Sequence, residues 1–190
     1  MSLDRRDVVR ELLKDRGDLL VVSGLGAPTY DVAAAGDCPL NFYLWGAMGG
    51  AAMIGLGLAL AKPGRRIAVI TGDGEMLMGL GSLATIGVKQ PGNLSIVVID
   101  NRHYGETGMQ ASHTAAGIDL AAIAKPCRFN SVHALRKPAD IDAARRLLHE
   151  GEGPVFIQAH VDWEEAPRVL PLRDGHAIKL RFVQALAEKR

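Results

Sequence analysis

The chain alternates short apolar runs with helical patterns along most of its length. Four runs, at residues 18–23, 66–71, 94–100 and 154–161, are dominated by Val, Ile and Leu. Strands that are buried on both faces have such continuous apolar runs, whereas a strand with one wet face alternates apolar and polar residues. Alternation of such strands with helices is typical of a parallel sheet covered on both sides. We therefore predict an α/β fold with a doubly wound parallel sheet and helices on both faces.

Helix and turn signals fill the intervals between these strands. Asp4 can cap a first helix that ends at Gly17, and Gly24, Gly26 and Pro28 predict a turn after the first strand. The remaining predictions are weaker strands at 41–45 and 129–133 and helices at 49–61, 75–88, 119–124, 138–150 and 176–189. The length and the absence of an internal repeat predict one domain, residues 1–190.

Composition excludes several classes of function. The 22 basic and 21 acidic residues leave a net charge of +1, without the basic excess that a nucleic-acid partner requires. The longest apolar stretch, residues 51–61, is shorter than the ~20 residues that span a bilayer. The first residues lack the apolar core of a signal peptide, and Cys38 and Cys127 suit a reducing compartment. We expect a cytoplasmic protein without nucleic-acid or membrane partners.

Chemically informative residues follow the strands directly, where ligands of such sheets bind. Gly72-Asp73-Gly74-Glu75 follows one strand and opens a helix, where free backbone N–H groups suit a phosphate. A carboxylate there is favourable if Mg²⁺ lies between Asp73 and the phosphate. Taken alone, the motif also fits a plain strand-to-helix turn.

Asp100-Asn101 ends the next predicted strand, 28 positions after Asp73. If the two strands are neighbours, the Asn101 amide oxygen lies beside Asp73, and the backbone carbonyl of His103 can supply a third metal ligand. An asparagine at this point also fits an ordinary turn.

Taken together, the two motifs resemble the signature of the thiamine diphosphate (ThDP) enzymes, which begins with Gly-Asp-Gly and ends in an asparagine-containing turn. The resemblance implies that Asp73, Asn101 and the carbonyl of His103 hold Mg²⁺ at the cofactor diphosphate. It also implies cofactor contacts at the residues that flank these ligands. The flanking residues are Gly72, Gly74, Glu75 and Tyr104. The family often has two asparagines where this chain has Asp100-Asn101.

Gly46-Ala47-Met48-Gly49 resembles the stretch with which the family holds the aminopyrimidine ring. The resemblance implies that the carbonyl of Gly46 accepts the amino group of the ring. It further implies that Met48 supports the bent cofactor, although a methionine there also fits ordinary core filling.

Three further segments resemble the sulfopyruvate and phosphonopyruvate decarboxylase group. They are IGLGLALAKP at 54–63, GDGEMLM at 72–78 and GSLATIG at 81–87. Two departures leave the 2-oxo acid undefined: Gly50 stands where the group commonly has histidine, and residues 109–114 (MQASHT) replace a Gly-Gln-Pro-Thr segment. The resemblance implies a beta-type subunit of a decarboxylase that acts on a 2-oxo acid with an anionic tail and gives an aldehyde and carbon dioxide.

The catalytic glutamate of the family lies on a pyrimidine-binding domain, for which this chain has no room. The resemblance therefore implies a pyrimidine-binding (alpha-type) partner subunit that carries the glutamate, and an oligomer with the cofactor at the interface. Within this chain, His113 is the candidate acid or base, although a loop histidine also fits an ordinary surface residue. An acetolactate-synthase-like carboligase subunit, a non-catalytic ThDP domain and a regulatory binding module remain as alternatives.

Overall fold

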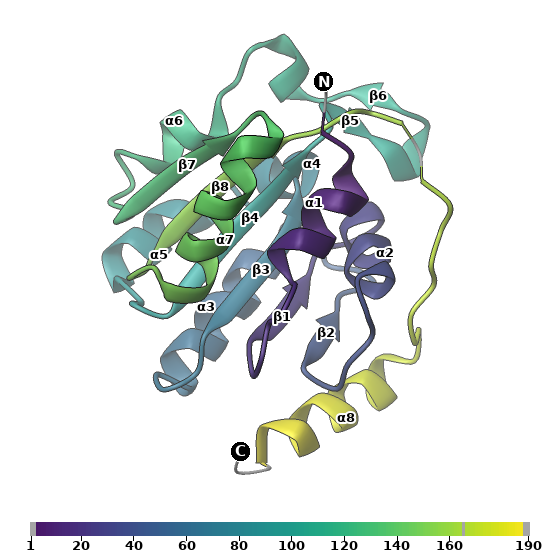
Figure 1. The fold of residues 1–190 in the computed structure, drawn as a ribbon, viewed down its shortest axis with the longest axis vertical. Coiled ribbons are helices and arrows are strands. Elements are labelled where there is room, and N and C mark those ends of the chain that lie inside the picture. The colour runs from purple at the N-terminus through teal and green to yellow at the C-terminus, as the bar shows by residue number, and fades with distance from the viewer. Residues whose placement is uncertain (1–2, 165, 188–190) are drawn as a thin grey trace.

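A six-stranded parallel sheet forms the centre of the computed structural model, which describes residues 3–164 and 166–187 (Figure 1). The strand order is β2-β1-β3-β4-β8-β7, and every neighbouring pair is parallel. The strands are β1 (Leu20–Ser23), β2 (Asn41–Tyr43), β3 (Ile67–Gly72), β4 (Leu94–Asp100), β7 (Ser131–Leu135) and β8 (Val155–His160). The predicted doubly wound α/β fold is confirmed.

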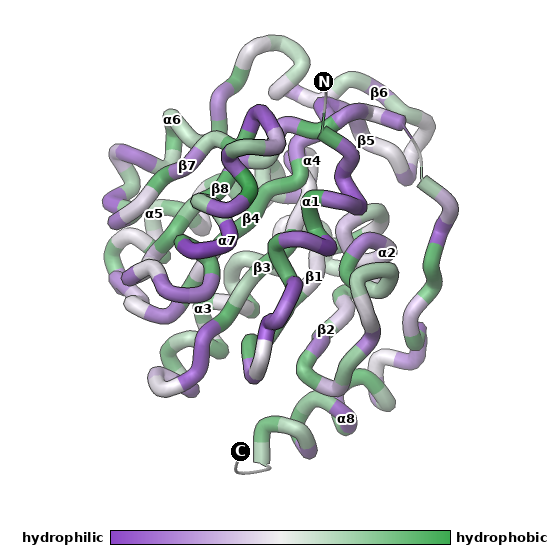
Figure 2. Tube along the Cα trace, viewed as in Figure 1, coloured by the Kyte–Doolittle hydropathy of each residue, from purple (hydrophilic) through white to green (hydrophobic). Residues whose placement is uncertain are grey.

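Helices cover both faces of the sheet. One face packs against α1 (Arg5–Leu12), α2 (Ala27–Ala34) and α7 (Ile141–Glu150), and the other against α3 (Ala51–Ala61), α4 (Asp73–Met78), α5 (Ser82–Lys89) and α6 (Leu120–Ala124). Successive strand residues point to opposite faces, so Val97 lies in one core cluster and Val98 in the other. All of β4 is buried, which explains its continuous apolar sequence (Figure 2).

The last helix covers the β2 edge of the sheet. After β8 the chain runs along the side of the molecule to α8 (Gly175–Ala187), which lies at the end opposite the β5–β6 hairpin (Figure 1). Phe182 of α8 packs edge-on against Phe42 with ring centroids 5.6 Å apart. Trp45 Nε1 donates to the Leu172 carbonyl at 2.9 Å and fastens the connecting segment. Residues 188 and 189 of the predicted helix lie outside the described residues.

The predicted turn after β1 lies at residues 25 and 26, and it leads into helix α2, which was not predicted. Gly26, with φ of +76°, lets the chain change direction, and Pro28 lies in the first turn of α2, where proline is well tolerated. Five consecutive residues of this helix, 28–32, are buried. Because α2 is covered on most sides, it lacks the apolar stripe by which a surface helix is predicted.

Other predicted boundaries also differ from the structure. The helix expected at 75–88 is two helices, α4 and α5, separated around Gly79 and Gly81. A Cβ at Gly79 would overlap the Gly49 carbonyl oxygen, so a close backbone approach requires glycine there. The first helix ends at Leu12 rather than Gly17. The short hairpin of β5 (His103–Tyr104) and β6 (Gln110–Ala111) was not predicted. Within the described residues, no helix is long and apolar enough to cross a membrane.

Candidate cofactor site

The two predicted motifs meet at the carboxyl edge of the sheet. Gly72 at the end of β3 is paired with Ile99 on β4, so Asp73 and Asp100 leave the sheet at the same level. In the sheet, β1 lies between β2 and β3. The chain therefore continues from β1 to β2 on one side, and β3 and the later strands lie on the other side of β1. The edge between β1 and β3 is thus a topological switch point, where sheets of this class bind their ligands.

A cavity opens at this switch point. Its lining includes all the predicted cofactor residues except Gly46, namely Met48, Gly72, Asp73, Gly74, Glu75, Asn101, His103 and Tyr104. The exposed His113 is outside the lining and contacts Tyr104, with 3.5 Å between Nδ1 and the phenol oxygen. The cavity holds about 120 Å³, well below the roughly 300–1,000 Å³ of a complete small-molecule pocket. The cavity is therefore too small to enclose a whole cofactor-sized ligand.

Glu75 uses its buried side chain to hold the loops around the cavity. Its carboxylate accepts from the backbone N–H groups of Leu25 at 2.9 Å and Ala51 at 3.3 Å, and from Thr71 Oγ1 at 3.0 Å. Burial raises the pKa of Glu75. A Cβ at Gly24 would overlap this carboxylate, which explains glycine there. The Glu75 side chain thus holds together the loops that surround the cavity. The backbone of Glu75 lies in the first turn of α4.

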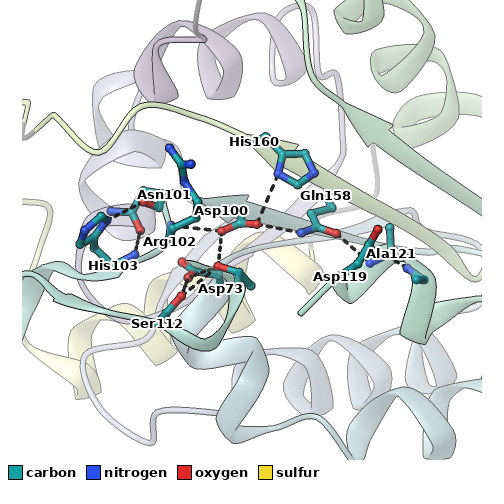
Figure 3. Close-up of polar contacts among 12 residues, drawn as sticks. Asp73, Asp100, Asn101, Arg102, His103, Ser112, Asp119, Ala121, Gln158 and His160 are labelled. Atoms are coloured by element: carbon teal, nitrogen blue, oxygen red, sulfur yellow. Dashed lines mark hydrogen bonds and ion pairs between the residues drawn. The ribbon is translucent and has the colours of Figure 1, made fainter. Parts of the chain in front are cut away.

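Asp100 is the centre of a buried polar network (Figure 3). Thr114 Oγ1 donates to its Oδ1 at 2.7 Å and Gln158 Nε2 to its Oδ2 at 2.7 Å. The backbone N–H of Arg102 also donates to Oδ1 at 3.1 Å, and His160 Nδ1 lies 3.5 Å from Oδ2. Asp100 therefore fixes the turn that carries Asn101.

The buried carboxylates of Asp73 and Asp100 share the hydroxyl of Thr114. Asp73 is 1% exposed, and its Oδ2 accepts from Ser112 Oγ and, at 3.1 Å, from Thr114 Oγ1. Burial raises the pKa of Asp73, and the hydrogen bond from Ser112 opposes this rise. Within the described part of the chain, neither Asp73 nor Asp100 forms an ion pair with lysine or arginine. Uncompensated buried charge is costly, so a divalent cation fits this edge.

The oxygen donors here suit a hard cation. Asn101 is 8% exposed, and its Oδ1 accepts from the backbone N–H of His103 at 3.0 Å, while its carbonyl contacts His103 Nδ1 at 2.9 Å. These contacts bring the Asn101 amide and the His103 backbone into one tight turn. Among the described residues, no group of three or more His, Cys, Asp or Glu side chains could hold a metal. A single carboxylate with neutral oxygens is instead the type of donor set that Mg²⁺ takes beside a phosphate.

The loop after β2 presents Met48 to the cavity. Ala47 has φ of +53°, a conformation that residues with a Cβ adopt rarely. Met48 is 36% exposed although it is apolar, and it lines the cavity. The exposed Gly46 lies outside the cavity lining. The cavity thus has an apolar side chain, Met48, on one side and the polar residues around Asp73 on another.

The structure adds residues that were not predicted from the sequence. Arg5 is buried against Asp31 at 2.8 Å and lines the cavity. Ser112 lies in the segment 109–114, which departs from the decarboxylase group, and its hydroxyl donates to Asp73. Gln158 is fully buried in β8, and a polar residue within an apolar strand was the one sequence signal that pointed to it.

Comparison with known proteins identifies the fold and the family. The family described as "Thiamine pyrophosphate enzyme, C-terminal TPP binding domain" matches residues 26–159. The sulfopyruvate decarboxylase beta subunit of Methanothermobacter thermautotrophicus is 39% identical over 97% of this chain and 96% of its own length, and that of Methanocaldococcus jannaschii is 35% identical over 96% of both chains.

Longer relatives match over only a part of their length. Phosphonopyruvate decarboxylase of Streptomyces viridochromogenes is 38% identical, and this chain spans 40% of it. A solved Mycobacterium smegmatis protein, assigned as a thiamin diphosphate-dependent enzyme, superposes with a TM-score of 0.71 at 18% identity, over 86% of this chain and 32% of its own. The chain belongs to the thiamine pyrophosphate enzymes and carries their C-terminal TPP-binding domain.

Proposed function

We propose that the chain is the diphosphate-binding, beta-type subunit of a ThDP- and Mg²⁺-dependent decarboxylase. Its substrate is a 2-oxo acid with an anionic tail, sulfopyruvate or phosphonopyruvate, and its products are an aldehyde and carbon dioxide. The observation that carries the proposal is the cavity at the β1–β3 switch point, where Asp73, Asn101 and Met48 converge. Similarity to two sulfopyruvate decarboxylase beta subunits over 96% of their length supports the reaction type.

In this proposal the metal and the diphosphate bind at the carboxyl ends of β3 and β4, where Asp73 lies. Asp73, the Asn101 amide oxygen and the His103 carbonyl are the Mg²⁺ ligands, and Gly72 and Gly74 let the backbone approach the phosphates. When bound, ThDP supplies the stabilisation of the carbanion that decarboxylation leaves behind.

Other residues orient the reactants and move protons. Met48 supports the cofactor ring and keeps water from its apolar side. The backbone carbonyl of Gly46 accepts a hydrogen bond from the amino group of the ring. His113, whose Nδ1 lies 3.5 Å from the Tyr104 hydroxyl, is the candidate acid that returns a proton to the product carbon, because histidine exchanges protons near neutral pH.

A pyrimidine-binding, alpha-type partner completes the site and contributes the glutamate that activates the cofactor. The small volume of the cavity supports this part of the proposal, since most of a ThDP-sized ligand must contact something else. The partner places the site at a subunit interface of an oligomer. The free thiols of Cys38 and Cys127 support a cytoplasmic location.

A carboligase subunit is the second candidate. Acetolactate synthase 2 of Zea mays is 29% identical over 67% of this chain, and the same half-site would serve either reaction. The higher identity and fuller coverage of the decarboxylase subunits favour decarboxylation.

Carbon dioxide release tests the proposal directly. The chain is co-expressed with a pyrimidine-binding partner and assayed with ThDP and Mg²⁺ on sulfopyruvate, phosphonopyruvate and pyruvate. We expect release from one of the two anionic-tail substrates, and loss of release when either chain is omitted. A stable complex that binds ThDP but releases carbon dioxide from none of the three would contradict the decarboxylase proposal and favour the carboligase.

A further inference from the structure

We propose that Ser112 and Thr114 are positioning residues for the metal carboxylate. Their hydroxyls hold one oxygen of Asp73 and so fix the orientation in which the other oxygen meets the cation. This inference rests on the proposed function and adds to it a role for the segment after β6.

Both hydroxyls end on the same oxygen of Asp73. Ser112 Oγ donates to Asp73 Oδ2, and Thr114 Oγ1 lies 3.1 Å from that oxygen and 2.9 Å from Ser112 Oγ. Ser112 is 3% exposed and Thr114 8% exposed. Because both side-chain hydrogen bonds to the carboxylate use Oδ2, Oδ1 is the oxygen left for a metal ion.

The two carboxylates, Asp73 and Asp100, compete for the hydroxyl proton of Thr114. Ser112 and Thr114 bring one hydroxyl proton each, whereas the oxygens of Asp73 and Asp100 both lie within hydrogen-bond distance of Thr114. The Thr114 hydroxyl shares its one proton between Asp100 Oδ1 at 2.7 Å and Asp73 Oδ2 at 3.1 Å, whereas Ser112 donates to Asp73 alone. Thr114 therefore links the two carboxylates. A cation at Asp73 Oδ1 would offset the negative charge of this pair.

The same two residues connect the metal edge to the rest of the site. The backbone N–H of Ser112 donates to the Arg102 carbonyl at 2.8 Å, which closes the segment onto the asparagine turn. Ser112 and Thr114 lie on either side of His113, so a fixed hydroxyl pair also fixes the backbone of the candidate acid. On the far side, Gln158 holds Asp100 and accepts from the N–H of Ala121 at 2.8 Å (Figure 3).

Ser112 and Thr114 contact Asp73 through its Oδ2 and are not themselves proposed metal ligands. Outer residues that orient metal ligands affect metal affinity strongly, and their loss typically costs about 10- to 100-fold.

Metal affinity of the complex tests the inference. The chain–partner complex is loaded with ThDP, and Mn²⁺ binding is measured by electron paramagnetic resonance, with Mg²⁺ as competitor. We expect Thr114→Val and Ser112→Ala each to weaken Mn²⁺ binding by about 10- to 100-fold, and Thr114→Ser to bind close to the wild type. Ser82→Ala is the matched control, because Ser82 is a buried serine on α5 whose hydroxyl has no hydrogen-bond partner in the described structure.

The outcomes separate this inference from the function on which it rests. Unchanged Mn²⁺ affinity in both Ser112→Ala and Thr114→Val, with ThDP bound, would overturn the positioning role alone. An equal loss in Ser82→Ala or in Thr114→Ser would also overturn it, because the effect would then be one of packing. A wild-type complex that binds ThDP without any divalent cation would overturn both the metal assignment and this inference.

Discussion

Tyr43 is a single residue that links two parts of the chain near the edge of the sheet. Its buried hydroxyl donates to Asp37 Oδ1 at 2.8 Å and accepts from Asn41 Nδ2 at 2.8 Å. Arg181 of α8 pairs with the same Asp37 at 2.8 Å. Burial raises the pKa of Tyr43 well above its usual value of 10, so the folded protein keeps this phenol neutral.

Replacing Tyr43 by Phe is expected to lower the free energy of unfolding by about 1–3 kcal/mol at pH 7, because two hydrogen bonds of about 0.5–1.5 kcal/mol each are lost. Above pH 10 the tyrosine of the unfolded wild type ionises while the folded one does not, so wild-type stability falls. The difference between the two proteins should therefore narrow above pH 10. Urea titrations of both proteins at pH 7 and at pH 10.5 measure this difference in the free energy of unfolding. An equal difference at the two pH values would contradict the raised pKa of Tyr43.

At the residue scale, the sequence correctly predicted proximity where the sheet sets the neighbours. Asp73 and Asn101 line the same cavity because parallel strands end at a common edge, and their role as metal ligands remains a proposal. Ser112 was not predicted, because its partner Asp73 lies 39 positions away and the contact depends on how the segment after β6 folds back. Gln158 was not predicted, because its partner Asp100 lies 58 positions away on β4, and the pairing of β4 with β8 was not predicted.

Helix α3 shows how an element adapts to its neighbours. It contains Gly55 and Gly57, two positions apart. A Cβ at Gly55 would overlap Val69 Cγ2 on β3, whereas a Cβ at Gly57 would meet nothing within 4 Å. Gly55 thus allows the helix to approach the sheet closely, and Gly57 has no such role.

The two glycines should respond in opposite ways to alanine. Gly57→Ala is expected to raise the free energy of unfolding by about 0.5–1 kcal/mol, because alanine loses less backbone entropy in a helix. Gly55→Ala should lower it, because α3 must move away from β3. Chemical denaturation of both variants measures the difference, and a similar gain in both would show that α3 is not packed as described.

For helices and strands, prediction depended on whether the sequence of the element carries a recognisable apolar pattern. The buried strand β4 was predicted with the bounds that it has, 94–100, since its mainly apolar run lies between Pro91-Gly92 and Asn101. Helix α2 was missed because it is buried on most sides, and the β5–β6 hairpin because strands of two residues carry no period.

At the scale of the whole molecule, one edge of the sheet carries the polar chemistry. Asp73, Asp100 and Asn101 lie at the carboxyl ends of β3 and β4, and the α8 end lies on the opposite side (Figure 1). The cavity that Asp73, Asn101 and Met48 line is too small for a complete cofactor. This volume supports the proposal that the chain contributes one part of an interfacial site.

The most direct test of this account is the Mg²⁺ dependence of ThDP binding to the chain–partner complex, measured by titration calorimetry. Asp73→Ala is compared with Asp142→Ala, a control at an exposed aspartate in the first turn of α7. We predict Mg²⁺-dependent binding in the wild type and the control. In Asp73→Ala the loss should exceed the roughly 10- to 100-fold cost of an outer-shell change. Equal ThDP affinity in Asp73→Ala and the wild type would contradict the assignment of this edge to the cofactor metal.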